Sequence, residues 1–172
     1  MLLERGFRLH VLTKSTLVLG DLDFFAGRPV QIGITLTTLD EQLRKLWEPG
    51  AASVQRRFCI IEAARQAGLQ TSVMFGPLLP FLSDSQEAID ALLGQAAELA
   101  IDRIWVDAIN PRPRVWPAIA DLLRAKFPDL LQPCRKILFD QAARTQYLKE
   151  LRGRVELAAS RASVAERVAA CM

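Results

Sequence analysis

Several polar side chains stand where apolar, strand-like segments end, and one of them, Lys14, is of a type that suits the binding of an anion. Lys14 and Ser15 follow the apolar run of residues 7–13, and Asp107 and Asn110 close a later run of the same kind. A lysine ammonium is a compact charge that suits a carboxylate or a phosphate. An isolated lysine past a strand is more often a solvated surface residue, and an asparagine before a proline is common in ordinary turns. Both interpretations stay open at the level of single residues.

The elements that position these residues follow a strand–helix alternation. Four short β-branched and apolar segments have the pattern of strands, and each precedes a segment with helical periodicity: they are Phe7–Thr13, Val30–Thr37, Thr71–Pro77 and Arg103–Ile109. Such alternation predicts an α/β fold with a parallel sheet. In parallel sheets, ligands bind beyond the carboxyl ends of the strands. The residues that follow the strands are therefore expected at one edge of the sheet.

The second strand alternates sharply between apolar and polar residues. One face carries Val30, Ile32, Ile34 and Leu36, and the other carries Gln31, Gly33, Thr35 and Thr37. A polar face in a parallel sheet indicates a lined interior that holds a ligand. The alternative is that threonine is present for its β-propensity alone. The sequence does not choose between the two.

Local signals place the helices between and after these strands. Thr38 with Glu41 and Ser83 with Gln86 fit capping boxes at the starts of two helices. From about Asp140 to the end, Ala, Glu, Arg and Leu dominate, which predicts one or two amphipathic helices.

Composition restricts the class of protein. The chain has 172 residues, of which 51% are hydrophobic, and a net charge of +3 from scattered charges, so one folded domain with no dedicated nucleic-acid patch is expected. Three cysteines (Cys59, Cys134 and Cys171) form no CxxC pattern, and Cys59 is expected to be buried. With His10 as the single histidine, a histidine-based metal site is excluded. No membrane-length apolar run or signal peptide is present, so a cytoplasmic location is the default.

Four stretches in order resemble one known superfamily. They are "HVLTKS", "GITLTTLDEQLRKLWEPGAASVQRR", "VMFGPLLPFLSD" and "WVDAINPRPRVW". Together they resemble the radical SAM superfamily, and more narrowly the spore photoproduct lyase-like (DNA repair photolyase-like) group. The resemblance implies a partial parallel (β/α) barrel of about four strands, with helices outside and further helices at the C-terminus. Residues 1–135 would form the C-terminal half of a (β/α)6 barrel, and residues 136–172 a helical extension.

The resemblance also implies roles for the strand-end residues. Lys14 would hold the methionine carboxylate of S-adenosylmethionine, with Ser15 beside it. Thr35 and Thr37 occupy the ribose-contact positions, where relatives often show asparagine.

Two further groups of residues take positions from the same pattern. Glu48, Gly50 and Arg57 correspond to a structural motif that would fix the following helix and loop. Asp107 and Asn110 would lie at the rim of the sixth barrel strand, as cofactor-binding positions without an assigned contact.

One defining motif of the superfamily is absent. Its CxxxCxxC loop holds a [4Fe–4S] cluster, and no such triplet occurs in these 172 residues. The resemblance maps the four strands onto barrel strands three to six, which makes Met1 an internal methionine or the start of a truncated or split reading frame. The chain would then be a C-terminal fragment of a lyase-like enzyme. Only a full-length form with the missing N-terminal half would carry the cluster and generate a 5′-deoxyadenosyl radical.

Expectations about partners follow from the same resemblance. An exposed strand edge and interior face predict association with the missing N-terminal half or with a second copy. DNA is the substrate class that the group name indicates, and the true substrate is not fixed by the sequence. Two alternatives remain: a non-catalytic half-barrel binding module, and an unrelated βα protein that holds a phosphorylated ligand at Lys14.

Overall fold

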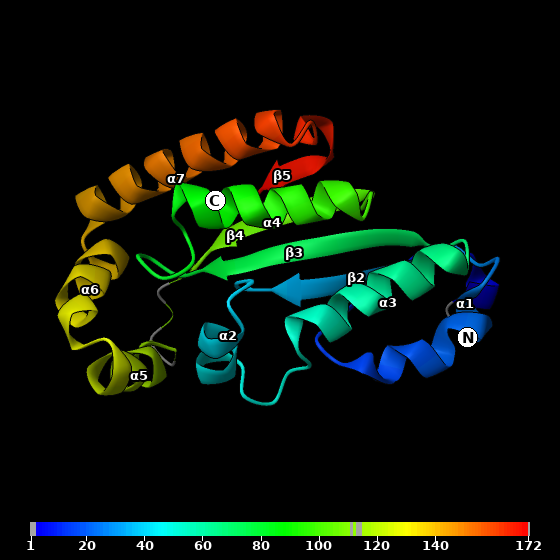
Figure 1. Cartoon of the computed structure of the whole chain (residues 1–172), viewed down its shortest axis with the longest axis horizontal. Coiled ribbons are helices and arrows are strands. Elements are labelled where there is room, and N and C mark those ends of the chain that lie inside the picture. Colours follow the sequence, from blue (N-terminus) through cyan, green and yellow to red (C-terminus); the bar gives the residue numbers. More distant parts are fainter. Residues whose placement is uncertain (1–2, 111, 113–114, 172) are drawn as a thin grey trace.

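One sheet of five parallel strands forms the centre of the structure, a computed structural model that describes residues 3–110, 112 and 115–171 (Figure 1). The strands lie in chain order from one edge of the sheet to the other. They are β1 (Leu9–Thr13), β2 (Val30–Leu36), β3 (Gln70–Leu78), β4 (Arg103–Ala108) and β5 (Val168–Ala170). The expected α/β fold with a parallel sheet is confirmed. The sheet is open, with β1 and β5 as its edges.

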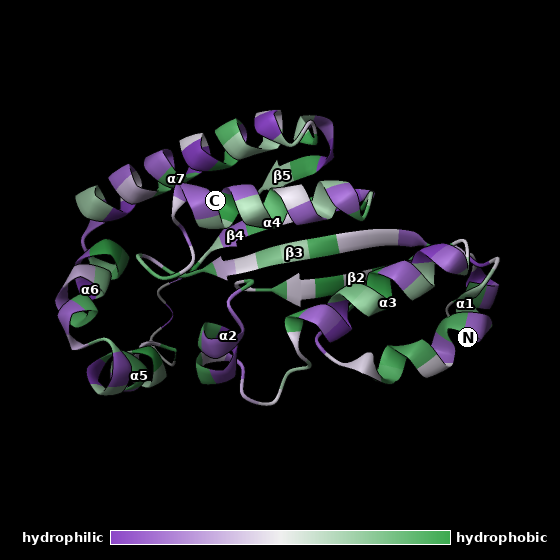
Figure 2. Cartoon of the chain, in the orientation of Figure 1, coloured by the Kyte–Doolittle hydropathy of each residue, from purple (hydrophilic) through white to green (hydrophobic). Residues whose placement is uncertain are grey.

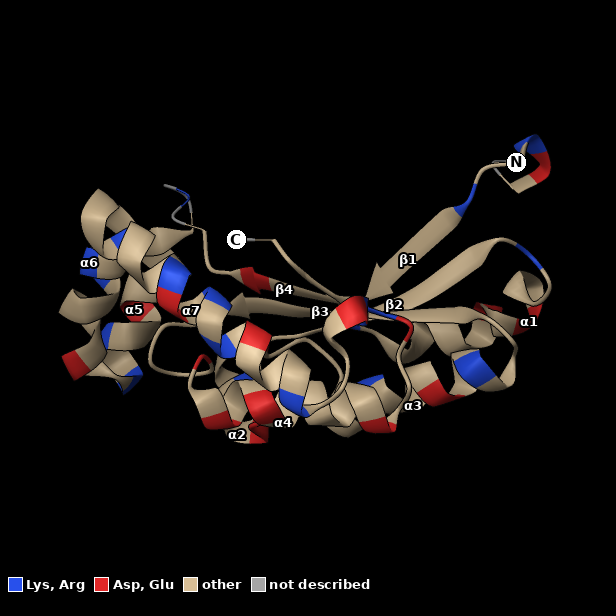
Figure 3. Cartoon of the chain, turned by 90° about the horizontal axis from the view of Figure 1, so that it is seen from above, with Lys and Arg blue, Asp and Glu red and all other residues tan. Residues whose placement is uncertain are grey.

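Helices cover one face of this sheet, and Figure 3 shows α2, α3 and α4 together on that side of the strands. The helices are α1 (Leu22–Phe25), α2 (Glu41–Trp47), α3 (Val54–Gln66), α4 (Gln86–Glu98), α5 (Trp116–Lys126), α6 (Leu131–Phe139) and α7 (Gln141–Arg161). Short 3-10 turns cover Leu3–Arg5, Thr16–Asp21, Pro128–Leu130 and Ala165–Arg167. Among the described residues, no helix is both long enough and apolar enough to cross a membrane.

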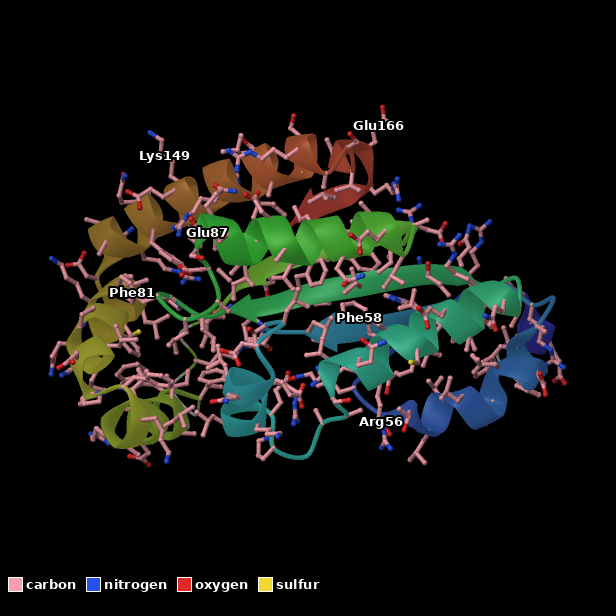
Figure 4. The ribbon with its side chains drawn as sticks, viewed as in Figure 1. Arg56, Phe58, Phe81, Glu87, Lys149 and Glu166 are labelled. Atoms are coloured by element: carbon pink, nitrogen blue, oxygen red, sulfur yellow. The ribbon has the colours of Figure 1, made fainter. Side chains whose placement is uncertain are left out.

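The core lies between the sheet and its helices. The apolar face of β2 is fully buried, and Phe58 of α3 lies against the sheet (Figure 4). Helix α7 packs on α4, and its residues Tyr147, Leu151 and Val155 join the same core. Hydrophilic and hydrophobic residues are interspersed along both α4 and α7 (Figure 2).

The other face of the sheet is concave and carries polar side chains. His10 of β1 shares a hydrogen bond with Ser72 of β3 (Nε2 to Oγ, 2.8 Å), and its ring centroid lies 5.1 Å from that of Trp105 in β4. Side chains stand roughly perpendicular to a sheet, and β1 and β4 are three strand spacings apart. In a flat sheet the two rings would therefore be roughly 14 Å apart. The strands therefore curve around this face.

Gly33 makes that curvature sterically feasible. A Cβ at this position would lie 2.4 Å from Ser72 Oγ, 2.9 Å from Leu12 Cδ1 and 3.0 Å from His10 Nε2. No side chain fits there without displacing the residues that meet across the concave face.

The C-terminal segment departs from the expectation of helices to the end of the chain. Residues Val168–Ala170 form β5, which pairs in parallel with β4 through the partners Ile104↔Val168, Trp105↔Ala169 and Val106↔Ala170. The part from residue 136 onwards thus adds both a helix to the core and a strand to the sheet.

Three local expectations are wrong. Asp40, not Thr38, caps α2 through its Oδ1, and Ser85, not Ser83, caps α4. In each case the polar residue nearest the helix start takes the free N–H groups, and the earlier residue bonds within its loop instead. Cys59 is exposed, because it lies on the outward face of α3.

Candidate functional site

An ion-pair network lies at the carboxyl ends of β1 and β2, where the sequence places its candidate anion-binding residues. Lys14 Nζ lies 2.5 Å from Glu48 Oε1, and Arg57 Nη2 lies 2.7 Å from Glu48 Oε2. The hydroxyl of Thr37 donates to Glu48 Oε1 over 3.1 Å. One carboxylate therefore joins the ends of two strands to helix α3.

Glu48 takes its position from the end of α2. It is the C-cap of that helix, and its backbone N–H donates to the carbonyl of Arg44. The Arg44 side chain in turn donates Nη1 to the carbonyls of Glu48 and Ala51, and its Nε to Glu41. The turn at Pro49 is thus held by a buried guanidinium that lies one helical turn before it.

Arg57 fixes the loop from the other side. It lies in the first turn of α3, whose N-cap is Ser53. Its Nε donates to the carbonyl of Ala52 at 2.8 Å, and its Nη1 donates to the carbonyl of Thr35 at 2.6 Å. The Ala52 N–H donates to the carbonyl of Lys14 at 3.0 Å, so the backbones of both strands are tied to this loop.

Burial differs strongly across the network. The Arg57 side chain is 0% exposed and that of Glu48 is 6% exposed, whereas that of Lys14 is 43% exposed. Arg57 Nη2 and Glu48 Oε2 lie close but without hydrogen-bonding alignment, so this contact is an ion pair. Glu48 and Arg57 are buried in the fold, and Lys14 presents its ammonium to solvent at the rim.

The pKa of Glu48 depends on two opposing effects, its burial and the positive charges beside it. Burial raises the pKa, but the close contacts and positive charges of Lys14 and Arg57 together outweigh burial and hold the pKa below the ordinary 4.5. Glu48 is therefore ionised at neutral pH and orients the lysine beside it.

Other predicted positions lie near this network with different roles. Ser15 accepts a hydrogen bond from the Leu17 N–H and caps the 3-10 turn after β1. Thr35 is half-buried, and Thr37 is buried with its hydroxyl directed at Glu48. Gly50 lies in the exposed turn after Glu48, where a Cβ would meet no atom within 4 Å.

Asp107 and Asn110 lie at the same edge of the sheet but on β4 and just beyond it. Asp107 is half-buried, and burial raises the pKa of its carboxyl, although the Ala108 N–H and the charges of Arg144 and Arg112 oppose the change. Asn110 is exposed. Among the described residues, no direct contact joins this pair to Lys14. Part of the "NPRPR" segment (111 and 113–114) lies outside the described residues, as does Met1.

Two functional features were not predicted. Arg44 is buried and holds the Glu48 turn, and its spacing of three from Glu41 and four from Glu48 was the available signal. The His10–Ser72 pair had no such signal, because it depends on the curvature of the sheet.

A metal centre does not form within the part of the chain that the structure describes. No group of three or more His, Cys, Asp or Glu side chains there is placed to hold a metal ion. Burial raises the pKa of the Cys134 thiol to about 11, with a smaller contribution from Asp84, while Cys59 and Cys171 are exposed and free. These residues do not fit an iron–sulfur cluster, which requires several converging thiolates.

Comparisons with known proteins give a consistent fold. No family model matches the chain. An uncharacterized protein of Mycobacterium tuberculosis is 34% identical over 136 residues, which cover 77% of this chain and 40% of that protein. A mutant form of spore photoproduct lyase, with bound AdoMet and a dinucleoside spore photoproduct, has a TM-score of 0.67 and 14% identity over 95% of this chain and 50% of its own.

A second solved structure lies further away. SuiB of Streptococcus suis, bound to S-adenosylmethionine, has a TM-score of 0.50 and 15% identity over 77% of this chain and 30% of its own. The chain thus spans about 40% of the length of its curated mycobacterial relative and half of the lyase. The chain therefore shares the α/β fold of these solved structures, with its parallel sheet left open rather than closed into a barrel.

Proposed function

We propose that this chain forms the S-adenosylmethionine-binding rim of a radical SAM lyase-like enzyme, and that Lys14 anchors the methionine carboxylate. The observation that carries the proposal is an exposed ammonium at the carboxyl end of β1, held in place by a buried carboxylate. It lies in a fold that matches spore photoproduct lyase over 95% of this chain.

The rim residues suit S-adenosylmethionine. A lysine ammonium has three donors, and one of them is engaged by Glu48, which leaves others for a ligand carboxylate. Thr35 is the better placed of the two ribose candidates, because the hydroxyl of Thr37 already donates to Glu48. Asp107 and Asn110 would complete the rim on the β4 side.

The iron–sulfur cluster of the proposed enzyme would take its ligands from outside the described residues. Because the described cysteines do not fit a cluster, its ligands would come from a segment that this chain does not contain. A missing N-terminal half would pair with the free edge of β1 and cover the concave face beside Lys14, and a second copy is the alternative partner. The free thiols suit a reducing, cytoplasmic compartment.

DNA is the substrate class we propose for the complete enzyme. The support is the dinucleoside spore photoproduct bound by the lyase that this fold matches, and it is support from a structural likeness alone.

Binding of S-adenosylmethionine tests the role of Lys14. Isothermal titration calorimetry would compare the wild type with Lys14→Ala, and with Lys149→Ala, whose exposed side chain on α7 points into solvent (Figure 4). Losing a charged hydrogen bond costs about 1.5–3 kcal/mol, so Lys14→Ala should bind roughly 10- to 100-fold more weakly. Lys149→Ala should bind like the wild type. Equal affinity of Lys14→Ala and wild type would refute the assignment.

A non-catalytic binding module is the second candidate function, favoured by the poor fit of a cluster to the described residues. Anaerobic reconstitution with iron and sulfide separates the two candidates. The chain alone should show no [4Fe–4S] absorbance, and the enzyme proposal expects that absorbance when the chain is mixed with a segment carrying CxxxCxxC. A cluster formed by this chain alone would overturn our view of its cysteines.

A further inference from the structure

A cavity of about 500 Å³ lies at the amino ends of β1 to β4, on the concave face but at the opposite edge from Lys14. Along β2 the two edges are separated by roughly 20 Å, at about 3.3 Å per residue. The cavity falls within the range of roughly 300–1,000 Å³ that small-molecule sites occupy. It is therefore a separate site from the S-adenosylmethionine rim.

The charge of this cavity is entirely positive. Arg8, Arg28 and Arg103 line it, and no Asp or Glu of the described part of the chain does. Arg8 and Arg103 have no carboxylate partner among the described residues, and Arg28 lies over the ring of Phe24 at 4.2 Å, a contact that leaves its N–H groups available. Figure 3 shows basic residues at the start of β1 and in the loop that leads into β2. Converging guanidinium groups without acids favour a phosphate-bearing ligand.

The inner wall of the cavity is aromatic and amide-rich. The rings of His10 and Trp105 lie 5.1 Å apart at 38° to one another, and both residues line the space. Gln31 donates its amide to the Thr71 carbonyl, which leaves its own side-chain carbonyl available, and Gln70 is exposed beside it. Aromatic rings stack nucleobases, and amide groups pair with their edges.

We propose that this cavity binds a nucleotide, with its phosphates on Arg8, Arg28 and Arg103 and its base against the His10–Trp105 pair. The ligand is a free nucleotide or the terminal nucleotide of a single strand, since both present the same chemistry. The site does not depend on the role of Lys14, because it lies at the other edge of the sheet.

Titration calorimetry on the full chain tests the site with three probes. ADP carries phosphates and a base, inorganic pyrophosphate carries phosphate alone, and 5′-phosphorylated oligothymidylate represents a strand end. ADP should bind more tightly than pyrophosphate. The double variant Arg8→Gln/Arg103→Gln should bind ADP about 100-fold more weakly, because each of the two lost charged contacts is worth about a factor of ten. Trp105→Leu should abolish the advantage of ADP over pyrophosphate.

Arg124→Gln is the matched control, since Arg124 is an exposed arginine of α5 that pairs with Asp121 away from the cavity. It should leave all affinities unchanged, and thermal melts of each arginine variant should match the wild type because these arginines are exposed. Tighter binding of the oligonucleotide than of ADP would identify the end of a strand as the ligand. Tighter binding of ADP would identify a free nucleotide. The absence of binding by all probes, or an equal loss in Arg124→Gln, would overturn the proposal.

Discussion

At the scale of single residues, Glu48 determines where Lys14 stands. Its carboxylate contacts Lys14, Arg57 and Thr37, and none of the three contacts is local in the chain. A buried ion pair contributes little net stability when both partners are present, but removing one partner leaves an uncompensated charge. Glu48 therefore connects the stability of the fold to the geometry of the rim.

Replacing this carboxylate tests the connection. Glu48→Gln leaves Arg57 buried without its counter-charge and should lower the free energy of unfolding at neutral pH by about 3–5 kcal/mol. The pKa of Glu48 is lower in the folded protein than in the unfolded chain. The ionised carboxylate therefore contributes its full stabilisation of the fold at pH values well above 4.5, and this contribution is lost as the pH falls through the pKa of the folded state. Urea unfolding at several pH values should thus show a flatter acid dependence for Glu48→Gln. Glu62→Gln, on the exposed face of α3, is the control and should keep the wild-type dependence of the unfolding free energy on pH. The same dependence in Glu48→Gln as in the wild type would contradict this role of Glu48.

The sequence pointed to these residues only in part. The resemblance to a known motif singled out Glu48 and Arg57, and the strand end singled out Lys14. That Lys14 meets Glu48 could not be predicted from composition or periodicity, because the contact depends on how the turn after α2 folds back across β1. The hydroxyl of Thr37 is committed to the same carboxylate for that reason.

At the scale of elements, the concave face depends on one glycine. Gly33→Ala would place a methyl group 2.4 Å from Ser72 Oγ and 3.0 Å from His10 Nε2. Because these distances are too short, either the side chains or the strands would have to shift. Overpacking of this kind costs about 1–3 kcal/mol, which chemical denaturation would measure. Gly153→Ala is the control, since nothing lies within 4 Å of that Cβ on α7 and the change should stabilise by about 0.5–1 kcal/mol. Equal stability of Gly33→Ala and wild type would show that the face is not closely packed.

Strand β5 shows why one element escaped prediction. Its three residues lie in an alanine-rich segment without alternation, so the local pattern indicates helix. Only the free edge of β4 makes it a strand, and this edge is a tertiary feature. The four longer strands were predicted because their apolar faces extend over five residues or more.

A pair of substitutions tests the orientation of β5. Val168 is half-buried against the core, whereas its neighbour Ala169 is exposed on the concave side. Val168→Lys should lower the free energy of unfolding by about 1–2 kcal/mol through lost apolar burial, and Ala169→Lys should change it little. Denaturant melts of the two variants provide the comparison. The opposite order would mean that β5 is turned over.

At the scale of the whole molecule, the sheet leaves one face and the outer edge of β1 uncovered among the described residues. Leu12 is 43% exposed on that face. Open parallel edges pair readily with other chains. The α/β architecture was predictable from the strand–helix alternation, but the partner that covers this face was not, because nothing in one chain's pattern names it.

Self-association follows from this geometry as a prediction. Sedimentation velocity should show a concentration-dependent increase in mass for the isolated chain, and Leu12→Lys, which places a charge on the uncovered face, should reduce it. Lys149→Ala should associate like the wild type. A monomer with a cooperative melt at micromolar concentration would show that the open edge is tolerated.

The turn that ends α2 has a consequence for protein engineering. Because the Lys14 carbonyl accepts from Ala52 and its ammonium contacts Glu48, the lysine is positioned by a segment that follows it by more than thirty residues. Transplanting the lysine alone into another scaffold would therefore transfer a charge without its orientation. The smallest transferable unit runs from β1 to the first turn of α3, a cassette in which the rim and its support are one piece.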